Sequence, residues 1–390
     1  MDRTDKRRHK RHEVAKKVIV VALATLFTVG ISLFIAVGIR YNDMPMKYRE
    51  NNGAYYNGQG EVKPSFSPIT KGGSSSCIMD VKSGRVLGGS NIDTPLPMAS
   101  TTKIVTAIVA IEKCADLDKV CDIPRKAIGV EGSSIYLKEG DRYSVRELLY
   151  GLMLRSGNDS AAAIAHIVGG SEEGFVELMN SKAKELSLSN THFVNPHGLH
   201  DDDHYTSAYD LAKISAYAMR NETFKEVVGT KSKVVGNAED GTKKYFVNKN
   251  KILSMYEGST GIKTGFTKVA GRCLVSAAER KGMEVVSVVL NHGDMWNDSM
   301  NNLDYAFANY FPIDIVTKDR MIETVSVNGK NIDVCVKEDF TYPIKKGEEN
   351  SLEYNIDIND VKNAQKDAHI GKFQVYCSKR LIFETKLYSM

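Results

Sequence analysis

Apolar positions return with a helical period through the middle of the chain. The run that follows Ser100 is apolar on every side, which predicts a fully buried helix. Apolar residues spaced three or four apart predict further helices over 144–154, 161–167 and 172–186, and a closing helix over 298–310. The middle of the chain is therefore expected to be helical.

Strand patterns stand on both sides of these helices. Two short segments, 75–81 and 85–87, predict a first β-hairpin. Three apolar segments with short connections predict an antiparallel meander: 261–266, 272–278 and 284–290. Helices in the middle with strands at both ends predict an α+β layer domain. After about residue 315, short β segments follow one another, which predicts a separate small β domain.

A different pattern occupies the N-terminus. Residues 18–39 form an uninterrupted run of 22 uncharged, mostly apolar residues, long enough to span a bilayer as a helix. The basic residues before it predict a cytoplasmic N-terminus and an extracellular C-terminal part, held in the cell membrane by this single pass. The alternative is a signal peptide cleaved after Ala36-Val37-Gly38, which would give a secreted protein.

These patterns divide the chain into five parts. The segment after the apolar run is rich in Asn, Gly, Tyr, Ser and Pro and has no apolar period, as is typical of a linker. The predicted division is a cytoplasmic basic tail (1–17), a transmembrane anchor (18–39), a linker (40–73), an α+β domain (74–314) and a small β-rich domain (315–390).

Charge and cysteine content narrow the function classes. The 390 residues carry a formal net charge of +4, but the first 17 hold eight Lys or Arg against three acids. The basic character belongs to the tail, so no nucleic-acid surface is predicted. In an exported domain, the pair Cys114/Cys121 or the pair Cys335/Cys377 could form a disulfide; otherwise most cysteines are small buried hydrophobes.

The first candidate for chemistry is Ser100 with Lys103. Positions i and i+3 stack on one helix face, so the hydroxyl and the amine are predicted to be neighbours. Burial against an apolar helix disfavours a charged amine, and a neutral amine can act as the base for a serine nucleophile. The spacing alone is weak evidence, because Ser181 and Lys184 repeat it on an amphipathic helix, where we expect both to be exposed.

Two more motifs occur in order behind this pair. Ser156-Gly157-Asn158 interrupts two predicted helices at a glycine, and Lys263-Thr264-Gly265 lies on a predicted strand and is the only Lys-Thr-Gly in the chain. Together with Ser100 and Lys103, they resemble the signature of the penicillin-recognising serine acyltransferases.

The resemblance extends beyond the three motifs. Residues 95–103, 154–159, 190–200 and 263–267 are similar to those of the serine-type D-alanyl-D-alanine carboxypeptidases, the low-molecular-mass penicillin-binding proteins. The similarity covers about residues 74–312 and implies a β-lactamase/transpeptidase-like domain, with an antiparallel sheet and a helical subdomain. The trailing β domain resembles that family's C-terminal domain.

The resemblance implies a mechanism. Ser100 would attack the carbonyl of the penultimate D-alanine of a peptidoglycan stem peptide, and Lys103 would take its proton. Ser156 would relay a proton to the leaving amine, while Asn158 orients Lys103 and the substrate. Water would then release the acyl group. β-Lactam antibiotics would act as covalent inhibitors, and neither a cofactor nor a metal is expected.

The strand motif would bind the substrate. Lys263 would raise the local positive potential and attract the terminal carboxylate, and Thr264 would donate a hydrogen bond to it. Gly265 continues this binding strand, and the backbone N–H groups of Ser100 and Phe266 would form the oxyanion hole.

The sequence departs from the family after the last strand of the predicted meander and leaves other functions open. Many relatives carry an Arg after the last strand that helps to hold the substrate carboxylate, but residues 291–297 contain none. A β-lactamase would need a dedicated carboxylate, for which only Glu239 is a weak candidate. A D,D-endopeptidase and a penicillin-binding module with decayed catalysis are further alternatives. The histidines between His192 and His204 predict a solvated loop rather than a metal site.

Overall fold

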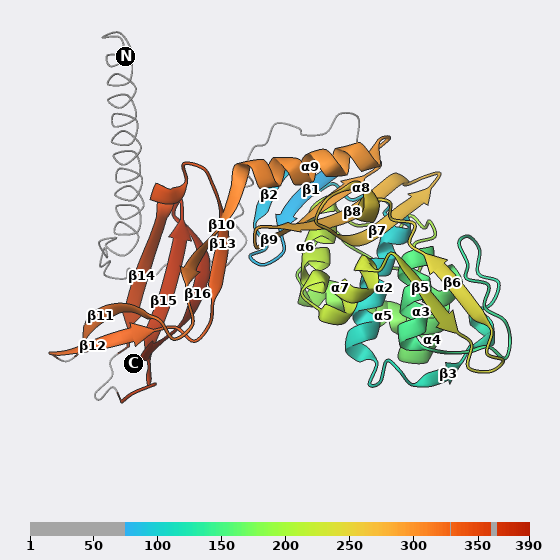
Figure 1. The fold of residues 1–390 in the computed structure, drawn as a ribbon, viewed down its shortest axis with the longest axis horizontal. Coiled ribbons are helices and arrows are strands. Elements are labelled where there is room, and N and C mark those ends of the chain that lie inside the picture. Colours follow the sequence, from blue (N-terminus) through green and yellow to red (C-terminus); the bar gives the residue numbers. More distant parts are fainter. Residues whose placement is uncertain (1–74, 328, 360–364) are drawn as a thin grey trace, which may run out of the picture.

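The structure is a computed structural model that describes residues 75–327, 329–359 and 365–390. The predicted tail, anchor and linker lie outside the described residues. Among the helices of the described ranges, none is long and apolar enough to cross a membrane. Two bodies are seen, a larger α+β body and a smaller β body, and α9 leads from the first to the second (Figure 1).

A five-stranded antiparallel sheet forms the centre of the larger body, in the order β2-β1-β9-β8-β7. Its strands are β1 (Ser75–Asp80), β2 (Val86–Ser90), β7 (Ser259–Thr267), β8 (Gly271–Arg280) and β9 (Met283–Leu290). The predicted hairpin and the predicted meander are both present. Because β1 pairs with β9, the two ends of this body close into one sheet.

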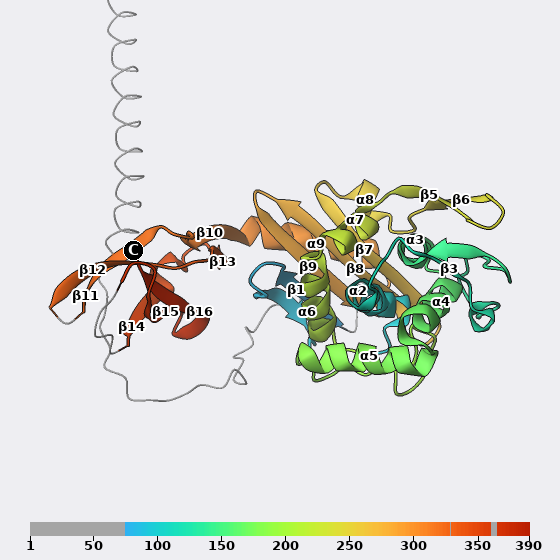
Figure 2. The same ribbon diagram turned by 90° about the horizontal axis from the view of Figure 1, so that it is seen from below.

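Helices cover both faces of the sheet, because its strands are apolar on both sides. Cys77 and Met79 of β1 belong to one apolar core, and Ile78 between them belongs to another. Side chains alternate between the two faces of a strand, so the two cores lie on opposite faces. α6 (Ala208–Met219) and α7 (Glu222–Gly229) pack on the first face, and α9 (Met295–Asn309) packs on the second (Figure 2).

The helical subdomain surrounds α2 (Lys103–Lys113). Every residue of this helix from Lys103 to Ala110 is buried, which confirms the predicted core helix. Its neighbours are α3 (Val145–Arg155), α4 (Asn158–Gly169), α5 (Glu172–Glu185) and α7. Smaller elements complete this body: β3 (Val120–Asp122), β4 (Arg142–Ser144), β5 (Ser232–Gly236), β6 (Lys243–Val247) and α8 (Ile252–Met255).

The smaller body contains a two-stranded and a five-stranded antiparallel sheet. β10 (Tyr310–Val316) pairs with β13 (Phe340–Lys345); the larger sheet holds β11 (Met321–Val327), β12 (Lys330–Cys335), β14 (Leu352–Ile358), β15 (His369–Cys377) and β16 (Arg380–Ser389). β10 begins at Tyr310, directly after α9, so the strand region starts ahead of the predicted boundary at 315. β10, β13 and β14 were not predicted; β10 and β13 each contain a proline, which argues against a strand, whereas β14 alternates apolar and polar residues as a strand does.

Arg85 joins the two bodies. It lies in the turn between β1 and β2, and its guanidinium donates to the Pro343 carbonyl oxygen at 2.6 Å and pairs with Glu348 at 2.8 Å. The rings of Tyr310 and Tyr342 lie 5.2 and 5.0 Å from it, within cation–π range. The β domain is thus attached by a charged contact as well as by the chain.

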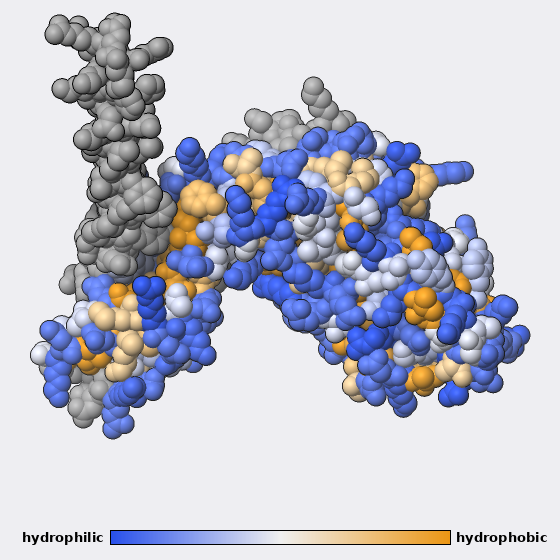
Figure 3. Space-filling model, viewed as in Figure 1, coloured by the Kyte–Doolittle hydropathy of each residue, from blue (hydrophilic) through white to orange (hydrophobic). Residues whose placement is uncertain are grey.

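The cores account for most of the apolar side chains. On the face shown in Figure 3, the described surface is mostly hydrophilic, and its apolar patches are small and separate.

All six cysteines are free thiols, and four of them are buried: Cys77, Cys273, Cys335 and Cys377. In this structure they behave as small hydrophobes, and neither of the two disulfides considered from the sequence is formed.

Candidate active site

Ser100 lies in a single 3₁₀ turn, Ala99–Thr102, that leads into α2. The other three residues of the turn are buried, whereas Ser100 is partly exposed. The hydroxyl of Thr101 donates to the Met98 carbonyl oxygen at 2.6 Å, and that of Thr102 donates to the Ala99 carbonyl oxygen at 2.8 Å. These two bonds hold the turn closed and leave the Ser100 hydroxyl accessible.

The amine of Lys103 lies at the centre of the site. It is fully buried, and its Nζ lies 3.0 Å from Oγ of Ser100, 2.7 Å from Oδ1 of Asn158 and 2.5 Å from the His197 carbonyl oxygen. Three polar contacts around one amine fix its position. The i, i+3 pair predicted from the sequence is therefore in direct contact, and Asn158 joins it from 55 residues away.

Burial lowers the pKa of Lys103 well below its usual range, because the charged form is poorly solvated there. The positive charges of Lys263 and Lys249 lower this pKa further, and Asp159 acts in the opposite direction. The neutral amine predicted from the apolar helix is thus favoured by burial and by two neighbouring cations. Lys249 had no distinguishing feature in the sequence.

Ser156 and Asn158 approach from the break between α3 and α4. Ser156 takes a left-handed conformation, with φ of 64°, and ends α3, while Asn158 begins α4 after Gly157. The side-chain amide of Asn158 donates to the Glu131 carbonyl oxygen, and its backbone N–H donates to the Ser133 carbonyl oxygen at 2.6 Å. With its amide donating, Oδ1 of Asn158 is the atom that faces Lys103.

Asp159 fixes the loop that lies against this break. Its carboxylate accepts the backbone N–H groups of Ile135 and Leu137, each at 3.1 Å, and the hydroxyl of Ser134 at 2.5 Å. Such a cluster satisfies a buried carboxylate and holds the loop rigidly. No role was predicted for Asp159, because the local sequence pattern does not show which distant N–H groups its carboxylate accepts.

Lys263, Thr264, Gly265 and Phe266 all lie on β7, at the edge of the sheet. Lys263 is buried, which lowers its pKa to about 7, and its Nζ donates to the Thr264 carbonyl oxygen at 2.9 Å. A Cβ on Gly265 would lie 3.0 Å from the Met98 carbonyl oxygen and 3.2 Å from the Ser100 nitrogen. Only glycine therefore lets β7 approach the Ser100 turn so closely.

Residues 190–200 supply part of the site that sequence reasoning missed. The His197 carbonyl oxygen accepts from Lys103, and the Pro196 carbonyl oxygen accepts the Thr106 hydroxyl at 2.6 Å. Nε2 of His204 lies 2.7 Å from the hydroxyl oxygen of Thr102, within hydrogen-bond distance. Among the described residues, no group of His, Cys, Asp or Glu side chains could hold a metal ion. His197 and His204 are buried and contact the nucleophile's turn and helix, so the prediction of a solvated loop is wrong for these two, whereas His192 and His200 are exposed.

The repeated motif at Ser181 and Lys184 has a different environment. Both residues are exposed on α5.

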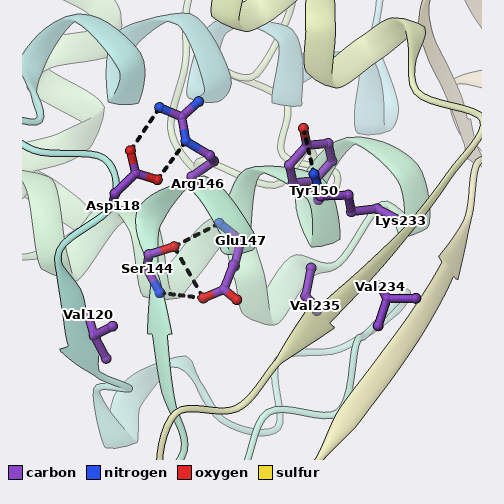
Figure 4. Close-up of a pocket in the computed structure, with 9 residues that line it drawn as sticks. All are labelled: Asp118, Val120, Ser144, Arg146, Glu147, Tyr150, Lys233, Val234 and Val235. Carbon is purple, nitrogen blue, oxygen red and sulfur yellow. Dashed lines mark hydrogen bonds and ion pairs between the residues drawn. The ribbon is translucent and has the colours of Figure 1, made fainter.

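A pocket of about 300 Å³ lies apart from the three motifs, between α3 and the hairpin of β5 and β6 (Figure 4). It is lined by Asp118, Val120, Ser144, Arg146, Glu147, Tyr150, Lys233, Val234 and Val235, none of which belongs to the three motifs.

Comparisons with known proteins match both bodies. The family model described as D-alanyl-D-alanine carboxypeptidase, peptidase S11, matches residues 64–294, and that of the penicillin-binding protein 5 C-terminal domain matches residues 310–390. The D-alanyl-D-alanine carboxypeptidase DacF of Bacillus subtilis is 34% identical over 74% of each chain.

Solved structures agree with these matches. Penicillin-binding protein 5 from Haemophilus influenzae has a TM-score of 0.69 and 26% identity, and covers 85% of this chain and 98% of its own. A variant of the Streptomyces K15 DD-transpeptidase has a TM-score of 0.58 and 33% identity, and covers 63% of this chain and 100% of its own. The chain therefore belongs to the D-alanyl-D-alanine carboxypeptidase family of serine peptidases, peptidase family S11.

Proposed function

We propose that this chain removes the terminal D-alanine from peptidoglycan stem peptides through an acyl-enzyme on Ser100. The observation that carries this assignment is the position of the Lys103 amine, 3.0 Å from Oγ of Ser100 and 2.7 Å from Oδ1 of Asn158. A hydroxyl in contact with a buried amine of lowered pKa is a nucleophile with its base. The family of the chain supports the substrate class.

The contacts of Lys103 suit a neutral amine. Such an amine has two N–H donors and one lone pair. Nζ lies within hydrogen-bond distance of Asn158 Oδ1, the His197 carbonyl oxygen and Ser100 Oγ. In the neutral amine the first two accept its N–H groups, and its lone pair would accept the proton of the Ser100 hydroxyl. In the acylation step the proton of Ser100 passes to Lys103 as Oγ bonds to the carbonyl carbon. The C–N bond then breaks, and D-alanine leaves with a proton relayed through Lys103 and Ser156.

The oxyanion hole consists of the backbone N–H groups of Ser100 and Phe266. Gly265 brings β7 against the Ser100 turn, so the two N–H groups can point to one substrate oxygen. Lys263 and Thr264 lie on the same strand, directly before the glycine that contacts the Ser100 turn. Water hydrolyses the acyl-enzyme afterwards, with Lys103 again as base, and the scheme needs no cofactor.

The alternatives have less support. A β-lactamase of class A type needs a carboxylate held near the acyl-enzyme to activate water. Glu239, the weak candidate from the sequence, is exposed in the turn between β5 and β6. A D,D-endopeptidase uses the same nucleophile on a cross-linked substrate, and a decayed module would keep the fold without turnover. The site contacts of Lys103 argue for turnover.

Product analysis tests the assignment. The full chain in detergent is incubated with a peptide that ends in Lys-D-Ala-D-Ala, with a cross-linked dimer, and with benzylpenicillin. We expect free D-alanine from the first, little cleavage of the second, and a long-lived penicilloyl-enzyme with the third. Rapid penicillin hydrolysis without D-alanine would instead indicate a β-lactamase, and penicillin binding without any turnover would indicate the decayed module.

We also propose that residues 18–39 anchor the chain in the cell membrane by a single pass, with the N-terminus cytoplasmic and the catalytic domain extracellular. The support is the length of the uncharged run and the basic residues before it. We expect the protein to remain in membranes after an alkaline wash, and protease added to intact cells to degrade the catalytic domain. A soluble extracellular product that starts after Gly38 would show signal cleavage instead.

A further inference from the structure

The terminal carboxylate of the substrate needs a cation, and the predicted partner is poorly placed to be the sole one. Lys263 is 1% exposed, and its Nζ donates to the Thr264 carbonyl oxygen. Burial lowers the pKa of Lys263 to about 7, so its charged form is less favoured than that of an exposed lysine. The segment 291–297, where many relatives carry an Arg, contains none.

The register of the sheet places another cation beside this strand. Arg272 of β8 lies directly opposite Phe266 of β7, and Leu274 lies opposite Thr264. Directly opposed residues project to the same face, and so do residues two apart, so Arg272 shares a face with Thr264 and Phe266. Diagonal neighbours across two strands are about 7–8 Å apart, which is within reach of a long side chain.

The guanidinium of Arg272 contacts the segment that follows β9. Its Nη1 donates to the Gly293 carbonyl oxygen at 3.0 Å, within the segment after β9. Arg272 is exposed, and within the described ranges it forms no ion pair with a carboxylate. A guanidinium has five N–H donors, so this single bond leaves a fork that can bind a carboxylate through two of them.

We propose that Arg272 binds the terminal carboxylate of the substrate, together with the hydroxyl of Thr264. Phe266, 65% exposed and opposite Arg272, borders the same place with an apolar ring. A guanidinium stays charged across the neutral range, whereas burial lowers the pKa of Lys263 to about 7. Arg272 thus supplies from β8 the charge that many relatives supply from the segment after β9. This assignment rests on the proposed function.

The test compares two substrates that differ only at the carboxylate. A peptide ending in D-Ala-D-Ala and its C-terminal amide are given to the full chain and to the variant Arg272→Gln. We expect kcat/KM for the acid to fall about 10- to 100-fold, as for loss of a charged hydrogen bond, and kcat/KM for the amide to change less than about threefold. Arg272→Lys should retain part of the preference for the acid.

Lys268→Gln is the matched control. Lys268 is exposed in the turn between β7 and β8, so its loss removes one positive charge from the same hairpin without touching the proposed contact. We expect Lys268→Gln to leave kcat/KM unchanged for both substrates. If Arg272→Gln slows the acid and the amide equally, Arg272 only supports Gly293, and the assignment is wrong; an unchanged acid rate overturns it as well.

A second readout separates this assignment from the proposed function. Benzylpenicillin carries a carboxylate and its methyl ester does not, and both can acylate Ser100 without release of D-alanine. Selective slowing of the free acid by Arg272→Gln would support Arg272 even if no D-alanine were released from any peptide. Equal acylation rates of wild type and variant by the free acid would contradict it.

Discussion

Replacement of Ser100 by Ala should reduce D-alanine release by about 10⁴-fold or more, because a methyl group cannot form the acyl-enzyme. The Ser100 side chain is partly exposed while the rest of its turn is buried, so the fold should tolerate the loss of one oxygen. D-Alanine release and covalent labelling by a fluorescent penicillin measure the effect, and a thermal melt close to that of the wild type shows that the variant is folded.

The chain carries its own control for this experiment. Ser181 begins the second Ser-x-x-Lys and is exposed on α5, so Ser181→Ala should leave release and labelling within about twofold of the wild type. Penicillin labelling that survives Ser100→Ala but not Ser181→Ala would place the nucleophile on α5 and would contradict the mechanism.

Replacement of Lys103 by Arg should lower the acylation rate by about 10²- to 10⁴-fold, the range lost with a general base. A guanidinium remains protonated, so it cannot accept the proton of Ser100. Arginine is also longer, and the amine that it replaces is already in contact with Asn158 and the His197 carbonyl oxygen. Single-turnover labelling by a fluorescent penicillin measures the rate; Lys184→Arg, at an exposed position, should have no effect.

The pH dependence of acylation is a second test of whether Lys103 is the base. Its pKa is lowered in the folded protein, mainly by burial and then by the charges of Lys263 and Lys249. The reactive form is the neutral amine, which is lost as the pH falls through the lowered pKa, so acylation should be retained at neutral pH and decline in acid. Lys249→Gln should move this decline to higher pH. A rate that falls below pH 9 or 10, as for an ordinary lysine, would show that Lys103 is not the base.

The elements that carry the site could be predicted from the sequence more completely than several elements away from it. The all-apolar run after Ser100, the glycine break at 156–158 and the strand around Lys263 are local features, and each appears where the pattern indicated. The strands β10 and β13 were missed although they are rich in apolar residues, and each contains a proline, which argues against a strand. β14 was missed although its residues alternate between apolar and polar, as a strand with one buried face requires. α6 and α7 were also missed.

What the sequence determined by itself was the set of reactive groups and their order along the chain. Ser-x-x-Lys occurs twice, and local context separated Ser100 from Ser181, because only the first opens an apolar helix. Burial, and with it the direction of the Lys103 pKa, follows from that same context, since a helix that is apolar all round must be covered.

Only the tertiary structure decided which distant groups meet these residues. Loop packing brings the carbonyl oxygen of His197 to Lys103. Strand register places Arg272 opposite Phe266, and its guanidinium contacts the Gly293 carbonyl oxygen. A backbone carbonyl has no signature in the sequence, and a one-residue change of register would turn Arg272 to the opposite face of the sheet. Such contacts arise from packing over long sequence distances, so local patterns cannot contain them.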